Sequence, residues 1–302
     1  MQRPQHVTDE RVADDFQAAA LYATADCVAA PTKPTIIDPP GRWELPQFRE
    51  VWDFRELLFF LTWRDVKVRY RQTALGVLWA LLQPLLAMLV FSLFFGRLAK
   101  VSSDGVPYAL FNLAGLVPWT FFTFGLNESA NSLVGSRQLI TKVYFPRLAI
   151  PLATVLAGAV DFAIGFVLLL VVMAGYGVVP GARVLMIVPL LLLGFTTAFG
   201  AGLWLAALNV QYRDVRYVLP FLTQLWMFVT PIVYSSSIVP ERWRPLYALN
   251  PMVGVVDGFR WALLGTPGPS GAIAASVIAA FALAAGGALY FRRMERAFAD
   301  VI

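Results

Sequence analysis

Residues 184–212 read VLMIVPLLLLGFTTAFGAGLWLAALNVQY, a run of 29 residues without a charged side chain. About 20 consecutive apolar residues are enough for a helix to cross the hydrocarbon core of a bilayer. The pattern recurs: 25 uncharged residues lie between Arg71 and Arg97, and 23 lie between Asp104 and Glu128. These stretches predict membrane-spanning helices.

Three further stretches extend the pattern. Residues 148–182 carry only Asp161, and residues 217–240 carry no charge. The last uncharged stretch, 261–291, is interrupted by GTPGPSG at 265–271, which limits its crossing to about 272–291. The sequence therefore predicts an all-α polytopic membrane protein with six transmembrane helices.

The composition agrees with this class. Apolar residues make up 58% of the chain and charged residues 14%, whereas soluble domains have about 45–50% and about 25%. The first 72 residues hold 21 of the 43 charged side chains. Both facts argue against a soluble two-domain enzyme and favour a polar N-terminal region followed by a membrane domain.

Several kinds of chemistry are excluded by residues the chain lacks. Cys27 is the only cysteine and His6 the only histidine, so neither a thiolate metal site nor a histidine proton relay can form in the spans. No Gly-Lys dipeptide occurs, which excludes a Walker A phosphate loop. Asp161 is the clearest intramembrane ionisable residue, and a simple pairing with a neighbouring helix is its leading interpretation.

The distribution of basic residues predicts the orientation. With the N-terminus inside, 14 Lys and Arg residues flank the spans on the cytoplasmic side and 6 flank them outside. Cytoplasmic loops of membrane proteins are enriched in basic residues. We therefore expect a multi-pass membrane protein with both termini in the cytoplasm, and we assign the net charge of +5 to topology and membrane lipids, with no nucleic acid involved.

Four regions follow along the chain. We expect a disordered cytoplasmic tail over 1–41, an interfacial helix region over 42–72, the six-span domain over 73–291, and a cytoplasmic tail over 292–302. Within 42–72, Trp52, Phe59, Trp63, Val66 and Tyr70 recur at helical spacing and predict an amphipathic helix. Residues 66–71 also alternate as a strand would, but the length favours helix.

Motifs along the chain resemble those of ABC-2 type polysaccharide exporter permeases, which export O-antigen, teichoic acid and related polymers. They are WRDVKVRYRQTALGVLW (63–79) with Gln83-Pro84 after it, DGVPY (104–108), LITKVYFPR (139–147), NVQYRDVR (209–216) and LNPM (249–252). Their order and spacing are also similar to the family's, and the resemblance covers about residues 45–292.

This resemblance implies an ABC-2 exporter fold and a non-enzymatic permease subunit. It implies a homodimer that works with two copies of a separate cytoplasmic ATPase, which binds Mg-ATP; no cofactor is expected on this chain. The cargo would be an undecaprenyl-diphosphate-linked polysaccharide. Two alternatives stay open: an ABC-2 exporter of another lipid or drug, and a membrane-embedded glycan-modifying transferase.

The resemblance also assigns roles to the loop between spans two and three. An ATPase-coupling helix is expected there, carried by Arg137, Lys142, Tyr144, Phe145, Pro146 and Arg147. An aromatic pair flanked by charges suits a small buried anchor with a polar rim. The alternative is that these basic residues only set the topology.

Two other sets concern the path of the cargo. Arg64, Lys67, Arg69 and Arg71 are expected to receive the diphosphate at the cytoplasmic gate, because arginine forks and lysine charges both suit phosphate; attraction to bulk anionic lipid is the alternative. Aromatic faces could offer sugar rings an apolar platform, and the candidates are Trp79, Phe91, Phe122 and Trp226. Lipid contact or packing would also explain these aromatics.

The last set is a predicted re-entrant helical hairpin over 238–264, between spans five and six. A seventh crossing would place Arg292, Arg293 and Arg296 outside, against the positive-inside bias. Pro251 also pushes Asn250 away from helical geometry. We therefore expect two short helices meeting at Asn250-Pro251 and forming a periplasmic gate with Tyr247, Asn250, Pro251 and Phe259. A passive surface loop is the alternative.

Overall fold

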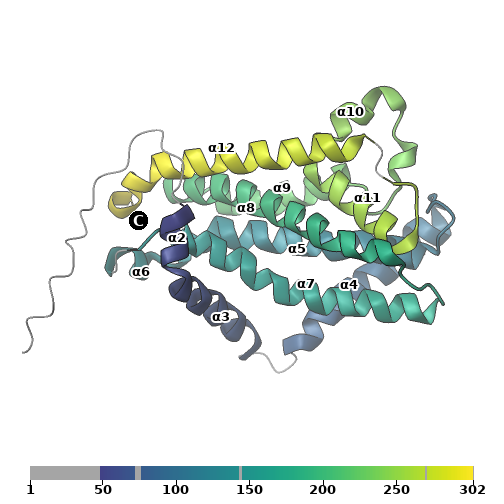
Figure 1. The fold of residues 1–302 in the computed structure, drawn as a ribbon, viewed down its shortest axis with the longest axis horizontal. Helices are drawn as coiled ribbons and strands as arrows, with labels where there is room; N and C mark the ends of the chain where they lie inside the picture. Colours follow the sequence, from purple (N-terminus) through teal and green to yellow (C-terminus); the bar gives the residue numbers. More distant parts are fainter. Residues whose placement is uncertain (1–47, 72–75, 143–144, 269–270, 302) are drawn as a thin grey trace, which may run out of the picture. The chain divides into compact units, whose positions relative to one another are not determined.

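The computed structural model describes residues 48–71, 76–142, 145–268 and 271–301, and within them the chain forms helices and turns without a β-strand (Figure 1). The all-α prediction is therefore confirmed for these ranges. The tail predicted over 1–41 lies outside them.

The helices run in the following order. They are α2 (Phe48–Asp53), α3 (Arg55–Arg71), α4 (Gly76–Phe91), the π-helix η1 (Ser92–Leu98), α5 (Tyr108–Gly135), α6 (Arg137–Lys142), α7 (Ala149–Gly175), the 3-10 helix η2 (Ala182–Met186), α8 (Ile187–Gln211), α9 (Val215–Val229), the 3-10 helices η3 (Ser236–Ile238) and η4 (Glu241–Trp243), α10 (Arg244–Tyr247), α11 (Pro251–Leu264) and α12 (Ala272–Val301).

Within the described ranges, five helical segments are long and apolar enough to cross a membrane. They are Leu78–Leu98, Tyr108–Gly135, Ala149–Gly175, Ala182–Gln211 and Ile273–Glu295. They match five of the six predicted spans, and the chain is accordingly a multi-pass membrane protein.

The other predicted span, 217–240, is helical only over its first part. α9 has 15 residues, or about 22 Å at 1.5 Å per residue, less than the hydrocarbon thickness of about 30 Å. Thr230 leaves helical geometry with φ −102° and ψ 139°. The residue before a proline is driven out of the α region, and Pro231 follows Thr230 directly.

The core of the bundle is α5, most of whose side chains are buried. It packs against α7 and α8, and α12 packs along α8, so that these four helices lie side by side (Figure 1). α3 packs across α7. Trp52, Phe59 and Trp63 are each more than half exposed, so the aromatic face of this helical region points away from the bundle.

Small residues let α8 and α12 approach closely. A Cβ at Gly287 would lie 2.3 Å from the carbonyl oxygen of Gly200, and a Cβ at Gly200 would lie 2.6 Å from the Cα of Ala284. Both clashes are with backbone, which cannot rotate away. Close backbone approach through small residues is typical of helix packing in membranes.

Adding a methyl group at this contact should therefore destabilise the protein. We expect Gly287→Ala to lower the free energy of unfolding by about 1–3 kcal/mol, the usual cost of overpacking. Gly135→Ala is the matched control, because a Cβ there meets nothing within 4 Å. Thermal unfolding of the two detergent-purified variants checks this; equal melting temperatures would contradict the close packing.

The segment after α9 contains the break predicted at Asn250-Pro251. α10 is a single turn, and α11 starts at Pro251 with Asn250 as its N-cap, whose side-chain oxygen accepts from the backbone N–H of Met252. α11 has 14 residues and is buried along most of its length, against α5, α8 and α12. The predicted helix boundary is confirmed, and the position of this hairpin in the membrane stays a prediction.

The chain's last helix continues past residue 292, where we expected the cytoplasmic tail to begin. α12 continues without a break to Val301, because no proline or glycine follows Gly287. Phe291 and Phe298 pack edge to face with ring centroids 5.2 Å apart. Residues 292–301 therefore continue the helix of the last span, and their position in the cytoplasm stays a prediction.

Candidate functional site

The two ends of α5 carry different chemistry. We call the basic end the region formed by the end of α5, by α6 and by the connection Tyr212–Asp214 between α8 and α9. We call the polar cluster the region at the start of α5 formed by Asp104, Ser235, Ser236, Ser237, Asp257 and Arg260. α5 spans 28 residues between them, so the two regions lie at opposite ends of the bundle.

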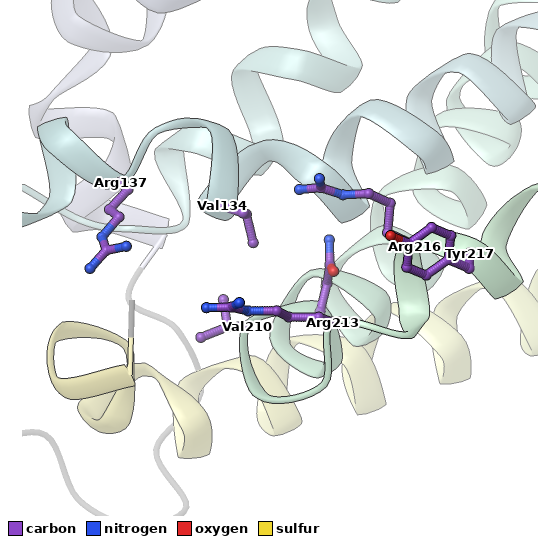
Figure 2. A pocket seen from close by; sticks show the side chains of 7 residues that line it. Val134, Arg137, Val210, Arg213, Arg216 and Tyr217 are labelled. Carbon is purple, nitrogen blue, oxygen red and sulfur yellow. The ribbon is translucent and has the colours of Figure 1, made fainter.

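At the basic end, the α8–α9 connection is fixed to α5 by Asn209. This buried side chain donates to the carbonyl of Ala130 at 2.9 Å and to the side-chain oxygen of Asn131 at 3.2 Å. The tether sets the position of Arg213 and Arg216 beside the start of α6. Figure 2 shows these two arginines and Arg137 around one pocket.

The predicted coupling residues divide into exposed and buried ones. Arg137 and Lys142 lie in α6 and are exposed, together with Gln138 and Thr141. Pro146 is partly buried, and Arg147 donates to the carbonyl of Glu295 on α12. Tyr144 lies outside the described residues.

Phe145 corrects one expectation for this loop. It is only 5% exposed and belongs to the hydrophobic core, so it anchors the loop within its own chain instead of offering a contact to a partner. The exposed side chains in the described part of this loop are polar and lie on α6.

The basic residues of α3 are partly neutralised inside the chain. Arg64 pairs with Asp65 at 2.8 Å. Arg69 pairs with Asp161 of α7 and lies 3.7 Å from the centre of the Phe124 ring. Lys67 and Arg71 are exposed. Asp161 is thus paired with a neighbouring helix, as its leading interpretation predicted. Among the residues that the structure describes, no carboxylate pairs with Lys67 or Arg71, the other two predicted phosphate ligands.

Tyr70 completes the contact between α3 and α7. Its hydroxyl donates to Asp161. Burial, followed by the hydrogen bond to Asp161, raises the pKa of Tyr70 above its ordinary value. The phenol therefore stays protonated and remains a donor at neutral pH.

The four predicted channel aromatics occupy different environments. Trp79 is 54% exposed and Phe91 is partly exposed on α4. Phe122 is fully buried, with its ring 4.8 Å from that of Trp226. Phe122 therefore does not face a conduit. The indole N–H of Trp226 donates to Asn250 at 2.9 Å.

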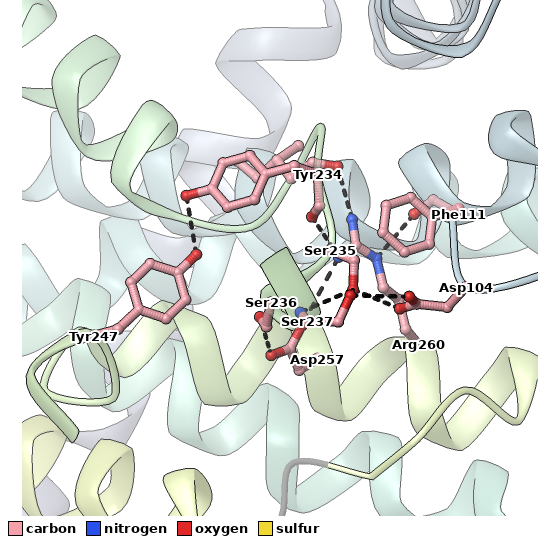
Figure 3. Close-up of polar contacts among 10 residues, drawn as sticks. Asp104, Phe111, Tyr234, Ser235, Ser236, Ser237, Tyr247, Asp257 and Arg260 are labelled. Carbon is pink, nitrogen blue, oxygen red and sulfur yellow. Dashed lines mark hydrogen bonds and ion pairs between the residues drawn. The ribbon is translucent and has the colours of Figure 1, made fainter. Parts of the chain in front are cut away.

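The polar cluster is built around a buried arginine (Figure 3). Arg260 on α11 is 2% exposed. Its guanidinium donates to the carbonyls of Phe111 at 3.0 Å, Ile232 at 2.7 Å and Tyr234 at 3.4 Å, and it lies 3.8 Å from Asp257. It thereby joins α11, the start of α5 and the segment after α9.

Burial sets the protonation of this pair. Desolvation lowers the pKa of Arg260 to about 10, against the favourable effect of Asp257. Desolvation also raises the pKa of Asp257, while Arg260 and Ser236 oppose that rise. At neutral pH the guanidinium stays charged and can hold all its acceptors.

Serine hydroxyls complete the cluster. Ser235 donates to Asp104 at 2.6 Å, Ser237 donates to the same carboxylate at 3.2 Å, and Ser236 donates to Asp257. Together with neighbouring groups these residues line a pocket of about 510 Å³. Sequence reasoning did not assign a role to any of the six, and Asp104 was noted only within the DGVPY motif, although an Asp and an Arg three residues apart in an apolar stretch are a usable signal.

The predicted gate residues lie beside this cluster, mainly as structural elements. Tyr247 donates to the hydroxyl of Tyr234 at 3.0 Å. Asn250 caps α11 and also donates to Thr230 at 3.0 Å, which joins the end of α9 to the start of α11. Pro251 and Phe259 are buried. Phe259 is therefore a core residue and does not line an opening.

Comparisons with known proteins agree with this architecture. Residues 56–264 match the family described as "ABC-2 type transporter". The chain is 35% identical over 214 residues to the O-antigen export system permease protein RfbA of Myxococcus xanthus, which covers 70% of this chain and 82% of that protein.

Two more relatives extend the coverage. The chain is 28% identical to an O-antigen export system permease protein RfbA of Klebsiella pneumoniae over 82% of this chain and 95% of that one. It is 27% identical to the polysialic acid transport protein KpsM of Escherichia coli over 77% and 91%. Taken with the five spanning helices, these matches show that the chain belongs to the ABC-2 type transporter family.

Proposed function

We propose that this chain is the permease subunit of an ATP-driven exporter of lipid-linked polysaccharide in the bacterial inner membrane. The observation that carries the proposal is the similarity to permeases named for O-antigen export, which spans up to 95% of their length. The absence of a Gly-Lys dipeptide supports a separate ATPase chain that binds Mg-ATP. Two copies of each chain would form the complete transporter.

Reconstitution tests the function directly. Proteoliposomes containing this permease and its ATPase should move an undecaprenyl-diphosphate-linked glycan to the opposite leaflet when ATP is supplied. Transport of a dye or phospholipid in its place would favour the alternative of another lipid or drug cargo. Glycan modified without being moved would favour the transferase. A polysialic acid cargo, in the same assay, would separate capsule export from O-antigen export.

The proposal includes an orientation with the basic end in the cytoplasm. This follows the excess of basic residues on that side. In a Cys27→Ser background, Glu241→Cys and Gly268→Cys should react with a membrane-impermeant maleimide added to intact spheroplasts, while Lys142→Cys should react only after permeabilisation. Both 241 and 268 are exposed residues in the structure. Labelling of position 268 from the cytoplasmic side alone would contradict the re-entrant hairpin.

The exposed face of α6 is proposed to dock on the ATPase. Reversing the charge in Lys142→Glu should weaken copurification with the ATPase by about tenfold, because a like charge would replace an attractive one at the contact. Arg242→Glu, an exposed residue far from the basic end, is the matched control. Phe145→Ala is unsuitable here, since it would open a cavity costing about 3–5 kcal/mol. Unchanged copurification and ATPase stimulation in Lys142→Glu would count against docking at α6.

The exposed basic residues Lys67 and Arg71 of α3 are proposed to rest on anionic headgroups of the cytoplasmic leaflet. Each such residue contributes about 1 kcal/mol to attraction by an anionic surface. α3 then acts as an interfacial anchor, and the exposed aromatic residues Phe59 and Trp63 on the same helix suit contact with lipid.

A further inference from the structure

Three arginines from three elements line one pocket at the basic end. Arg137 starts α6, Arg213 lies in the α8–α9 connection and Arg216 lies in the first turn of α9. The pocket measures about 290 Å³. In Figure 2 the guanidinium groups of Arg213 and Arg216 extend in the same direction, towards Val134 and Arg137. A concave site of this size fits a compact headgroup and not a polymer chain.

Within the described part of the chain, no carboxylate oxygen lies within 4 Å of these three guanidinium groups, although Asp214 follows Arg213 in the sequence. The other residues lining the pocket there are neutral: Val134, Asn209, Val210 and Tyr217. Five other arginines are paired: Arg64, Arg69, Arg244, Arg260 and Arg292 each lie within 4 Å of a carboxylate oxygen. Three guanidinium groups around one hollow, none of them in an ion pair within 4 Å, attract a multivalent anion.

A second observation concerns the surface next to the pocket. Tyr217, Phe221, Leu225 and Phe228 follow one another at spacings of four, four and three, which places them on one face of α9. Their side chains are 80%, 63%, 48% and 52% exposed. This α9 stripe begins at the pocket, so a basic hollow continues directly into an exposed apolar track.

We propose that this pocket binds a diphosphate group, carried by a lipid whose isoprenoid chain lies along the α9 stripe. The proposal rests on the proposed function, which requires a lipid-diphosphate cargo. Guanidinium groups donate paired hydrogen bonds to phosphate oxygens, and the stripe supplies the apolar contact. A free diphosphate and a lipid diphosphate present the same phosphate groups to the arginines. The α9 stripe favours the lipid-borne form, because only the lipid has an apolar chain to lie along it.

Binding to the purified permease in nanodiscs tests this assignment. One probe is inorganic pyrophosphate, and the other is undecaprenyl diphosphate incorporated in the disc. The Arg213→Gln/Arg216→Gln variant should bind both about 100-fold more weakly, because each lost set of charge-assisted hydrogen bonds accounts for about tenfold. Arg213→Lys/Arg216→Lys should lose less affinity for both probes, since the positive charges are kept while the forked geometry of the guanidinium groups is lost. Arg242→Gln, at the other end, should bind normally.

A substitution in the α9 stripe distinguishes a lipid-borne diphosphate from a free one. Phe221→Asn should weaken binding of the lipid while leaving pyrophosphate binding unchanged; equal behaviour of both probes would overturn the lipid-borne part. Normal pyrophosphate binding by Arg213→Gln/Arg216→Gln would overturn the site. If that variant keeps both ligands but loses copurification with the ATPase, the pocket is a protein-docking surface and the proposal is overturned.

The same proteoliposomes distinguish this inference from the proposed function. Export by the wild-type transporter together with undiminished ligand binding in the arginine variant would overturn the pocket alone. Diphosphate binding at the pocket without any glycan export by the wild type would overturn the proposed function alone.

Discussion

Replacing Arg260 with methionine should lower the free energy of unfolding by about 3–5 kcal/mol, as expected when one partner of a buried ion pair is removed. The substitution leaves Asp257 without its cation and deprives the carbonyls of Phe111, Ile232 and Tyr234 of a donor. Since Arg260 on α11 holds carbonyls from the start of α5 and from the segment after α9, the end of the bundle that holds α11 should loosen as a unit.

Two comparisons make this result specific. Arg260→Met/Asp257→Leu should recover part of the lost stability, because it also removes the orphaned carboxylate. Arg244→Met, at an exposed residue paired with exposed Glu241, should stay within about 1 kcal/mol of wild type. Thermal unfolding and hydrogen exchange at α11 would measure all three. A wild-type melting temperature in Arg260→Met would show that the network does not hold this end together.

Reversing a charge at the contact between Arg69 and Asp161 should also have a large effect, on both stability and export. Arg69→Asp and Asp161→Arg each place like charges face to face between α3 and α7, at a site where both side chains are about one-third exposed or less. The cost should be roughly 1–3 kcal/mol, between the values for surface and buried pairs. We expect glycan export by either single variant to fall about tenfold or more.

The double variant separates two roles of Arg69. Arg69→Asp/Asp161→Arg restores opposite charges and should recover much of the export if Arg69 positions α3. If Arg69 instead contacts the diphosphate of the cargo, the double variant should export no better than Arg69→Asp alone. Lys67→Gln serves as the control for a general loss of positive charge on α3.

Much of the fold could be predicted from charge alone, because a charged residue inside a span is costly and therefore rare. Uncharged stretches gave five of the spans. The sixth was predicted too long because its length was taken from the absence of charge, whereas Pro231 ends the helix at Val229. Prolines at 118 and 220 lie inside helices, so a proline by itself does not identify the end of a helix.

The candidate site was harder to predict, because burial depends on partners that are distant in the sequence. Phe145, Phe122 and Phe259 look like surface anchors or channel walls by residue type, and each is packed in the core. Arg213 and Arg216 were noted only within a motif, and their convergence with Arg137 depends on the Asn209 tether across 78 and 79 residues. The ion pair of Arg69 was hard to predict for the same reason, since its partner Asp161 lies 92 residues away.

Arg260 also bears on how the protein is inserted during synthesis. An arginine in the middle of an inserting helix costs about 2.5–3.5 kcal/mol, and α11 is too short to span on its own. Its three carbonyl acceptors belong to residues 111, 232 and 234, all of which leave the ribosome before it. The acceptors are therefore already made when the arginine emerges, and α11 can settle onto a preformed surface instead of entering the lipid with an unpaired charge.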